Sequence, residues 1–149
     1  MKKKLFIMFL GVLLVVSLCG TTMAKPPGEG AVVYSDSESV SPQGTAYLIS
    51  FAGAMLKDEG DLQVTIGGFT QTWAPKEYIS GRVYLQRWNG SRWVNVDSRL
   101  FYRFNHFYTC GEKLIDVTPG FYRAHSIHYA EHRGVSHTMY VTTGSRYVY

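Results

Sequence analysis

The sequence predicts an all-β protein, an antiparallel β-sandwich of about seven strands that follows a helical leader. Aromatic residues make up 15% of the 149 residues, and glycine occurs 15 times. Aromatic and β-branched residues favour strands, while glycine favours the turns between them. Beyond the leader, no apolar pattern keeps a helical period, and short alternating segments follow one another without intervening helices. These observations together indicate β-structure from residue 45 onward.

The first 24 residues have the layout of a secretory signal peptide. A lysine cluster precedes an apolar run of about 14 residues from Leu5 to Leu18, and small residues flank the predicted cleavage site after Ala24. A membrane-spanning helix needs about 20 apolar residues, so we expect cleavage and secretion rather than retention as an anchor. A minor alternative is a lipid anchor at Cys19, although Leu18 stands where lipoprotein cleavage sites usually have a small residue.

Removal of the leader lowers the net charge of the chain. The whole chain has a formal net charge of +4, from 15 basic and 11 acidic residues. Three of the lysines leave with the signal peptide, so the mature chain keeps 12 basic residues and a net charge of +1. This near-neutral balance predicts neither a nucleic acid partner nor a membrane-surface partner after cleavage.

Cysteine content agrees with export but excludes a disulfide scaffold. Of the 2 cysteines, Cys19 lies in the leader, so Cys110 is the single thiol of the mature chain. Stability must therefore come from a packed core. One alternative function is a small secreted hydrolase, in which Cys110 is the nucleophile and a histidine its base. The simpler interpretation is a half-buried thiol without a catalytic role.

The mature chain divides into a lead-in and one domain. Residues 25–44 are rich in Pro, Gly and Ser, and we expect a flexible lead-in there, followed by the β-sandwich domain at 45–149. A turn is expected at 57–61 and a loop around Pro75 at 74–81. The expected strands are 45–51, 62–66, 69–73, 82–88, 91–96, 99–104, 106–110, 113–117, 121–130 and 136–142, with a terminal piece at 146–149.

The strongest local signal is a β-hairpin around Asn89 and Gly90. Asn-Gly is the preferred pair for a tight type I′ turn, because both residues tolerate positive φ. Alternation along the flanking strands then places one set of apolar residues toward the core. This predicted core set is Val83, Leu85, Val94 and Val96.

The same alternation places three aromatic residues of the hairpin on its outer face. Tyr84, Trp88 and Trp93 are expected to lie close together there, with Arg92 available for an anion contact. Exposed rings of this kind stack on sugar rings or become buried against a protein partner. The competing interpretation is that the rings only stabilise the hairpin.

Two segments resemble fibronectin type III and related immunoglobulin-like domains. Residues 81–96 are similar to the third strand and following hairpin of such domains, and residues 121–136 are similar to the long penultimate strand. Pro119 and Gly120 resemble the corner that leads to a conserved tyrosine. The resemblance implies that the Tyr122 ring lies in the core while its hydroxyl bonds nearby backbone. It leaves Trp73 as the candidate for the buried tryptophan of these domains.

The layout from residue 45 to residue 149, with the leader before it, also resembles an uncharacterised family of small secreted proteins from Gram-positive bacteria. Such a resemblance implies a fold but no particular chemistry, because immunoglobulin-like folds carry many functions.

Histidine spacing does not favour a metal site. His125 and His128 are three positions apart, which places them on opposite faces of a strand, and His132 adds no familiar zinc motif. The sequence also lacks the usual hydrolase and phosphate-binding motifs. It therefore predicts no metal, no cofactor and no catalytic residues.

The prediction for function is a secreted, non-enzymatic binding module that uses the aromatic cluster of the hairpin. The candidate partners are a cell-wall glycan and an extracellular protein. Besides the hydrolase, a secreted toxin or competition factor is an alternative, motivated by small size and release.

Overall fold

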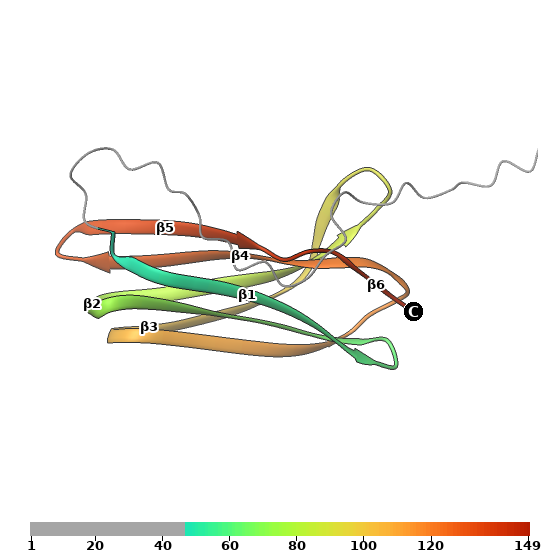
Figure 1. Cartoon of the computed structure of the whole chain (residues 1–149), viewed down its shortest axis with the longest axis horizontal. Coiled ribbons are helices and arrows are strands. Elements are labelled where there is room, and N and C mark those ends of the chain that lie inside the picture. Colours follow the sequence, from blue (N-terminus) through green and yellow to red (C-terminus); the bar gives the residue numbers. More distant parts are fainter. Residues whose placement is uncertain (1–46) are drawn as a thin grey trace, which may run out of the picture.

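The computed structural model describes residues 47–149, so the predicted signal peptide, Cys19 and the lead-in lie outside the described residues. The described strands are β1 (Ile49–Gly60), β2 (Gln63–Trp88), β3 (Trp93–Asp116), β4 (Gly120–His132), β5 (Val135–Thr142) and β6 (Arg146–Val148). All of them pair antiparallel within one sheet (Figure 1). The prediction of an all-β, antiparallel protein is confirmed. Among residues 47–149 there is no helix with the length and apolar character that a membrane crossing requires.

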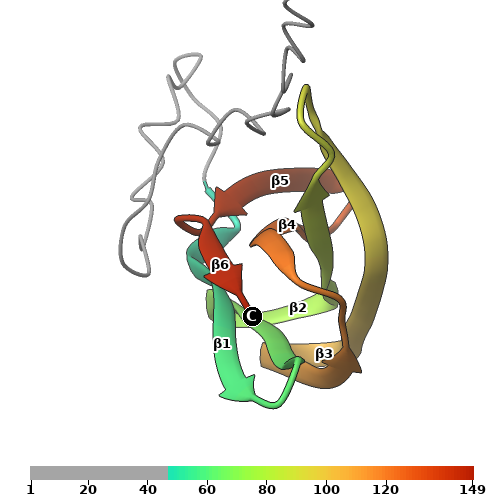
Figure 2. The ribbon, with the colours of Figure 1, turned by 90° about the vertical axis from the view of Figure 1, so that its right-hand side faces the viewer.

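The two longest strands change partners along their length. The beginning of β2, up to Gln71, pairs with the end of β3, and it also pairs with β1. From Tyr78 on, β2 pairs with the beginning of β3 on one side and with β4 on the other. The sheet therefore curls around a shared interior, as the end-on view in Figure 2 shows. At one end of the curl, the Ile49 amide donates a hydrogen bond to Nδ1 of His137 on β5 at 3.3 Å.

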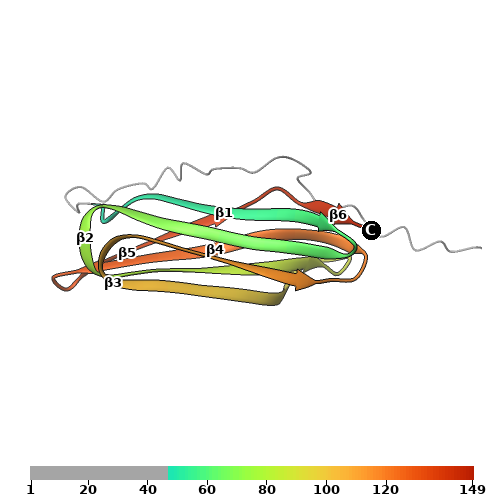
Figure 3. The same cartoon turned by 90° about the horizontal axis from the view of Figure 1, so that it is seen from below.

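The predicted loop at 74–81 is wrong, because β2 continues through it. Gln71 and Lys76 form successive ladder pairs with β3, and the residues between them make a bulge around Pro75. A bulge tolerates proline because the missing N–H breaks no ladder bond there. Figure 3 shows β2 and β3 turning this corner together. Trp73 lies at the corner and is 81% exposed, so it is not a buried core tryptophan.

Other predicted boundaries are also corrected. The turn expected at 57–61 begins later, because β1 runs to Gly60 and the chain reverses at Asp61 and Leu62, which have φ of 49° and 58°. The separate strands expected between 99 and 117 are parts of one strand, β3. Both β1 and β3 are longer than expected because each pairs along the long strand β2.

The interior is built mainly from alternate residues of β2 and β4. Val83 and Leu85 are fully buried, as the hairpin pattern predicted. Val94 is only half-buried, and Val96 is 50% exposed, so the prediction that Val96 faces the core is wrong. The reason is a bulge in β3: Leu85 pairs with Asp97 but Gln86 pairs with Asn95, which leaves Val96 without a ladder partner.

Tyr122 anchors the corner before β4. Its side chain is 2% exposed, and its hydroxyl donates to the Thr118 carbonyl at 2.8 Å. Both features agree with the geometry implied for this tyrosine. The Pro119 carbonyl accepts a hydrogen bond from Arg87 Nη2 at 2.9 Å, and Gly120 leaves space for the same guanidinium. The corner therefore joins the start of β4 to the end of β2, next to the hairpin loop.

Candidate functional site: the aromatic face of the hairpin sheet

The β2–β3 hairpin ends in a four-residue loop rather than in the expected two-residue turn. Trp88 pairs with Trp93, and the Asn89 amide donates to the Arg92 carbonyl at 3.1 Å. Gly90 has a φ of 100°, whereas Asn89 is not among the residues with positive φ, so a type I′ turn does not form. Instead, Oδ1 of Asn89 accepts hydrogen bonds from the backbone amides of Ser91 at 3.0 Å and Arg92 at 2.9 Å. In Figure 1 this hairpin tip projects away from the body of the sheet.

Replacing Asn89 by alanine removes the acceptor that closes this loop. Because two backbone amides lose their partner, we expect the free energy of unfolding to fall by about 1 kcal/mol. Urea denaturation followed by circular dichroism measures the change. An Asn89→Asp variant keeps the acceptor oxygen and should retain most of the stability, and an equal loss in both variants would contradict the assigned role.

The two tryptophans of the hairpin face each other. The ring centroids of Trp88 and Trp93 are 5.4 Å apart with an interplanar angle of 60°, and both side chains are half-buried. The guanidinium that lies over Trp93 belongs to Arg123 on β4, at 4.4 Å from the ring centroid. Arg92, which the sequence offers for an anion contact, is exposed in the loop. The structure thus brings Trp88 and Trp93 together and adds Arg123, which the sequence analysis did not name.

A row of polar side chains crosses three strands beside the tryptophans. Arg123 Nε donates to Gln86 Oε1 at 2.8 Å, and Gln86 Nε2 donates to Asn95 Oδ1 at 2.8 Å. Burial lowers the pKa of Arg123, but a guanidinium remains charged at neutral pH. The row therefore holds a fixed cation and two oriented amide groups next to the indole rings.

Tyr84 lies further along the same face. It pairs with Ser98 on β3 and with His125 on β4, so the polar row separates it from the tryptophan pair. His125 Nδ1 shares a hydrogen bond with Thr142 Oγ1 at 2.8 Å. Burial, and secondly the charge of Arg123, lower the pKa of His125, which is thus uncharged near neutral pH.

A second group of rings occupies the far end of this face. The Tyr78 centroid is 5.2 Å from Phe104, 6.2 Å from Tyr102 and 6.0 Å from Tyr129. Phe104 is 64% exposed. Tyr78 and Trp88 are ten positions apart on β2, which corresponds to about 33 Å of extended strand.

We refer to this surface as the aromatic face. It consists of Tyr78, Tyr84, Gln86, Trp88, Trp93, Asn95, Tyr102, Phe104, Arg123, His125 and Tyr129. Alternation along the predicted hairpin identifies Tyr84, Trp88 and Trp93 from the sequence alone. Tyr78 was missed because a loop was expected at 74–81, and the remaining members from β3 and β4 depend on the register between strands.

The other predicted or considered sites are dispersed. His128 points into the interior while His125 lies on the outer face, and among residues 47–149 no three His, Cys, Asp or Glu side chains are grouped to hold a metal ion. Cys110 is exposed and lies in a hollow on a different part of the sheet. The described lining of that hollow includes no histidine that could act as a base for the thiol.

Comparison with known proteins identifies no relative, since no family model, curated protein or solved structure matches the chain. The resemblances to fibronectin type III domains and to small secreted Gram-positive proteins therefore stay predictions.

Proposed function

We propose that the protein is a secreted, non-enzymatic binding module that holds an extracellular glycan on its aromatic face. The observation that carries the proposal is the tryptophan pair with the row Arg123–Gln86–Asn95 beside it. A sugar ring has apolar C–H faces and a rim of hydroxyls. Indole rings offer a stacking surface for the former, and fixed guanidinium and amide groups offer hydrogen bonds to the latter.

The length of the aromatic face supports a chain-like ligand. A second ring cluster around Tyr78 lies about 33 Å from Trp88, estimated from the rise per residue of a strand. A polymer of sugars could contact both clusters at once. Once the polymer is held at one cluster, its contact with the other is intramolecular, so the overall affinity exceeds that of either cluster alone. We take a cell-wall glycan as this polymer, because the sequence predicts secretion and resembles small secreted proteins of Gram-positive bacteria.

The proposal includes the fold assignment that the sequence suggested. We propose an immunoglobulin-like β-sandwich in which β1, the beginning of β2 and the end of β3 form one layer. The beginning of β3, the end of β2, β4 and β5 form the other layer. The partner change along β2 supports this division, and so does the hydrogen bond of 2.9 Å from Thr70 Oγ1 to the Ser80 carbonyl, which joins the two parts of β2.

The test is binding of the mature protein to arrays of cell-wall and other glycans. We expect Trp93→Ala to weaken binding by about thirtyfold, because a central aromatic anchor contributes about 2 kcal/mol or more. Trp73→Ala is the matched control. It removes an indole that is 81% exposed at the corner of the sheet and outside the aromatic face, so binding should not change.

Two outcomes would overturn the glycan proposal. One is that Trp93→Ala binds every array component as well as the wild-type protein does. The other is that the protein binds no glycan but captures an extracellular protein in a Trp93-dependent manner, which would assign the aromatic face to a protein partner.

A further inference from the structure

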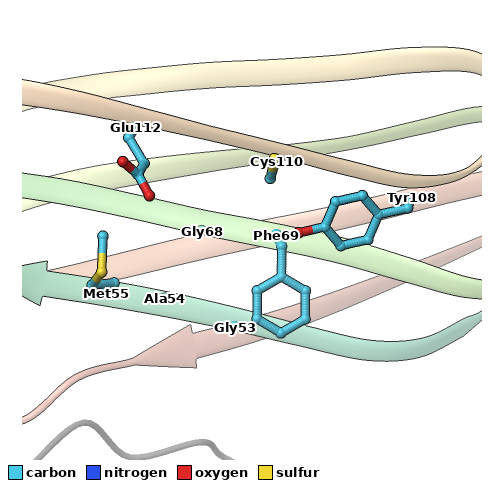
Figure 4. Close-up of a pocket in the computed structure, with 8 residues that line it drawn as sticks. All are labelled: Gly53, Ala54, Met55, Gly68, Phe69, Tyr108, Cys110 and Glu112. Carbon is cyan, nitrogen blue, oxygen red and sulfur yellow. The ribbon is translucent and has the colours of Figure 1, made fainter.

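A hollow of about 270 Å³ opens on the sheet formed by β1, the beginning of β2 and the end of β3. It lies apart from the aromatic face, and Figure 4 shows its lining. The residues that shape it are Met55, Gly68, Phe69, Tyr108, Cys110 and Glu112. Its size suits a small organic group rather than a polymer.

Glycines create the hollow. The Phe69 ring lies over Gly53, where a Cβ would overlap the ring. On the next strand, a Cβ at Gly67 would meet Glu112 Cγ at 2.9 Å and Met55 Cε at 3.0 Å. Glu112 and Met55 therefore face each other from β3 and β1 across a strand that has no side chain there, while Phe69 stands further along (Figure 4).

Aromatic rings form one wall of the hollow. The Phe69 ring is nearly parallel to those of Phe51 and Tyr108, with centroid distances of 5.7 Å and 6.1 Å and interplanar angles of 26° and 24°. Burial first, and then the contact with Cys110, raise the pKa of Tyr108, so its phenol is uncharged at neutral pH. The wall is an apolar surface with electron-rich faces, which attract cations.

A single carboxylate supplies the charge of the hollow. Of the described lining residues, Glu112 is the only one with a carboxylate, and none is a lysine or an arginine. On β1, the ammonium of Lys57 forms its salt bridge with Glu59 at 2.6 Å. The pKa of Lys57 is raised first by Glu59 and only last by Glu112. Glu112 is thus an anion beside an aromatic wall, a combination that complements a cation with apolar substituents.

We propose that this hollow binds a small organic cation of the alkylammonium class. The ammonium group lies against Glu112, and its alkyl substituents contact Phe69, Tyr108 and Met55. This site is independent of the glycan proposal, because it uses another part of the sheet and a different ligand chemistry.

Choline is the probe, and its neutral isostere, in which a tert-butyl group replaces the trimethylammonium group, is the control ligand. Both are titrated into the mature protein while the amide signals of Gly67, Gly68 and Cys110 are followed by NMR. In parallel, the alkylation rate of Cys110 by an uncharged reagent is measured, because a bound ligand should shield this exposed thiol. We expect saturable shifts and slower alkylation with choline, and at least about tenfold weaker binding of the isostere.

Glu112→Gln keeps the shape of the side chain and removes its charge. We expect choline binding to weaken by about tenfold in this variant. Glu131→Gln, on β4, is the matched control and should bind choline as the wild-type protein does. Absence of saturable shifts, equal binding of the two probes, or unchanged binding in Glu112→Gln would each overturn the proposal. Trp93→Ala should leave choline binding intact, so this test fails or succeeds separately from the glycan test.

Discussion

Replacing Phe101 by alanine is expected to lower the free energy of unfolding by about 3–5 kcal/mol. Phe101 comes from β3 and is 5% exposed, so its ring belongs to the interior. Its centroid is 6.4 Å from that of His128 on β4. Truncation would leave a cavity between β3 and the centre of the sheet, and the curled sheet cannot close this cavity without breaking its ladders.

Two glycines make room for this ring, Gly81 on the neighbouring strand β2 and Gly111 further along β3 itself. A Cβ at Gly81 would overlap the Phe101 ring and would lie 3.1 Å from Nδ1 of His128. A Cβ at Gly111 would lie 2.9 Å from Cβ of Phe101. The large ring on one strand therefore requires the missing side chain on the next, and Gly81→Ala should destabilise the fold although it adds a single methyl group.

A double-mutant cycle tests this coupling. Phe101→Leu is smaller and is expected to relieve part of the overlap, so Gly81→Ala should cost less in the Phe101→Leu background than in the wild-type protein. Urea unfolding of the four proteins measures the interaction free energy. Strictly additive effects, or a stability of Phe101→Ala within about 1 kcal/mol of wild type, would contradict the packing described.

Local alternation accounts for the parts of the fold that sequence analysis predicted. Val83 and Leu85 are buried and Trp88 faces Trp93, because a hairpin sets its own register close to the turn. The same period of two places His125 on the outer face and His128 in the interior. These inferences need no knowledge of distant strands.

The side-chain positions that the sequence did not predict result from a single extra residue in β3 and from pairing between strands that are distant in the sequence. The bulge at Val96 reverses the alternation along β3, so Phe101 faces the interior while Tyr102 and Phe104 join the aromatic face. Nothing in the segment from 99 to 104 signals this reversal, because most of its residues are apolar or aromatic. Arg123 reaches Trp93 only because β4 pairs with β2, a contact that local patterns cannot supply.

Acidification is expected to remove about 3 kcal/mol of stability between pH 6.5 and 4 through the buried His128. Its Nδ1 lies 2.8 Å from Thr70 Oγ1, and its Nε2 lies 2.7 Å from Ser126 Oγ. Thr70 donates its proton to the Ser80 carbonyl at 2.9 Å, so Nδ1 donates to Thr70. The neutral ring carries one N–H, so Nε2 accepts the Ser126 proton, because the Ser126 hydroxyl lies closer to this nitrogen than to the Val141 carbonyl at 3.3 Å. The interior thus holds the neutral imidazole with both nitrogens hydrogen-bonded.

The direction of the effect follows from the two states of the chain. Burial first, and then the charge of His125, lower the pKa of His128 to about 4 in the folded protein, against an ordinary value of 6.5. Below pH 6.5 the unfolded chain binds a proton that the folded protein does not, so stability is complete above that pH and falls until the folded pKa is reached. Burial also lowers the pKa of His137, which adds to the loss in the same direction. The hydrogen bond with Lys113 lowers the pKa of Asp97 from its ordinary value of 3.8. The stability that this carboxylate provides is therefore present at higher pH, and most of its loss falls at lower pH than that caused by His128.

Two measurements test this assignment to His128. Urea unfolding at a series of pH values should show a smaller loss of stability between pH 6.5 and 4.5 in His128→Gln than in the wild-type protein, even if the variant is less stable at every pH. The NMR signals of the His128 ring should show no titration in the folded protein near pH 6.5. An unchanged pH dependence in the variant would show that other groups cause the acid sensitivity. A His128 that titrates at its ordinary pKa would contradict the burial described and would show that water reaches this part of the interior.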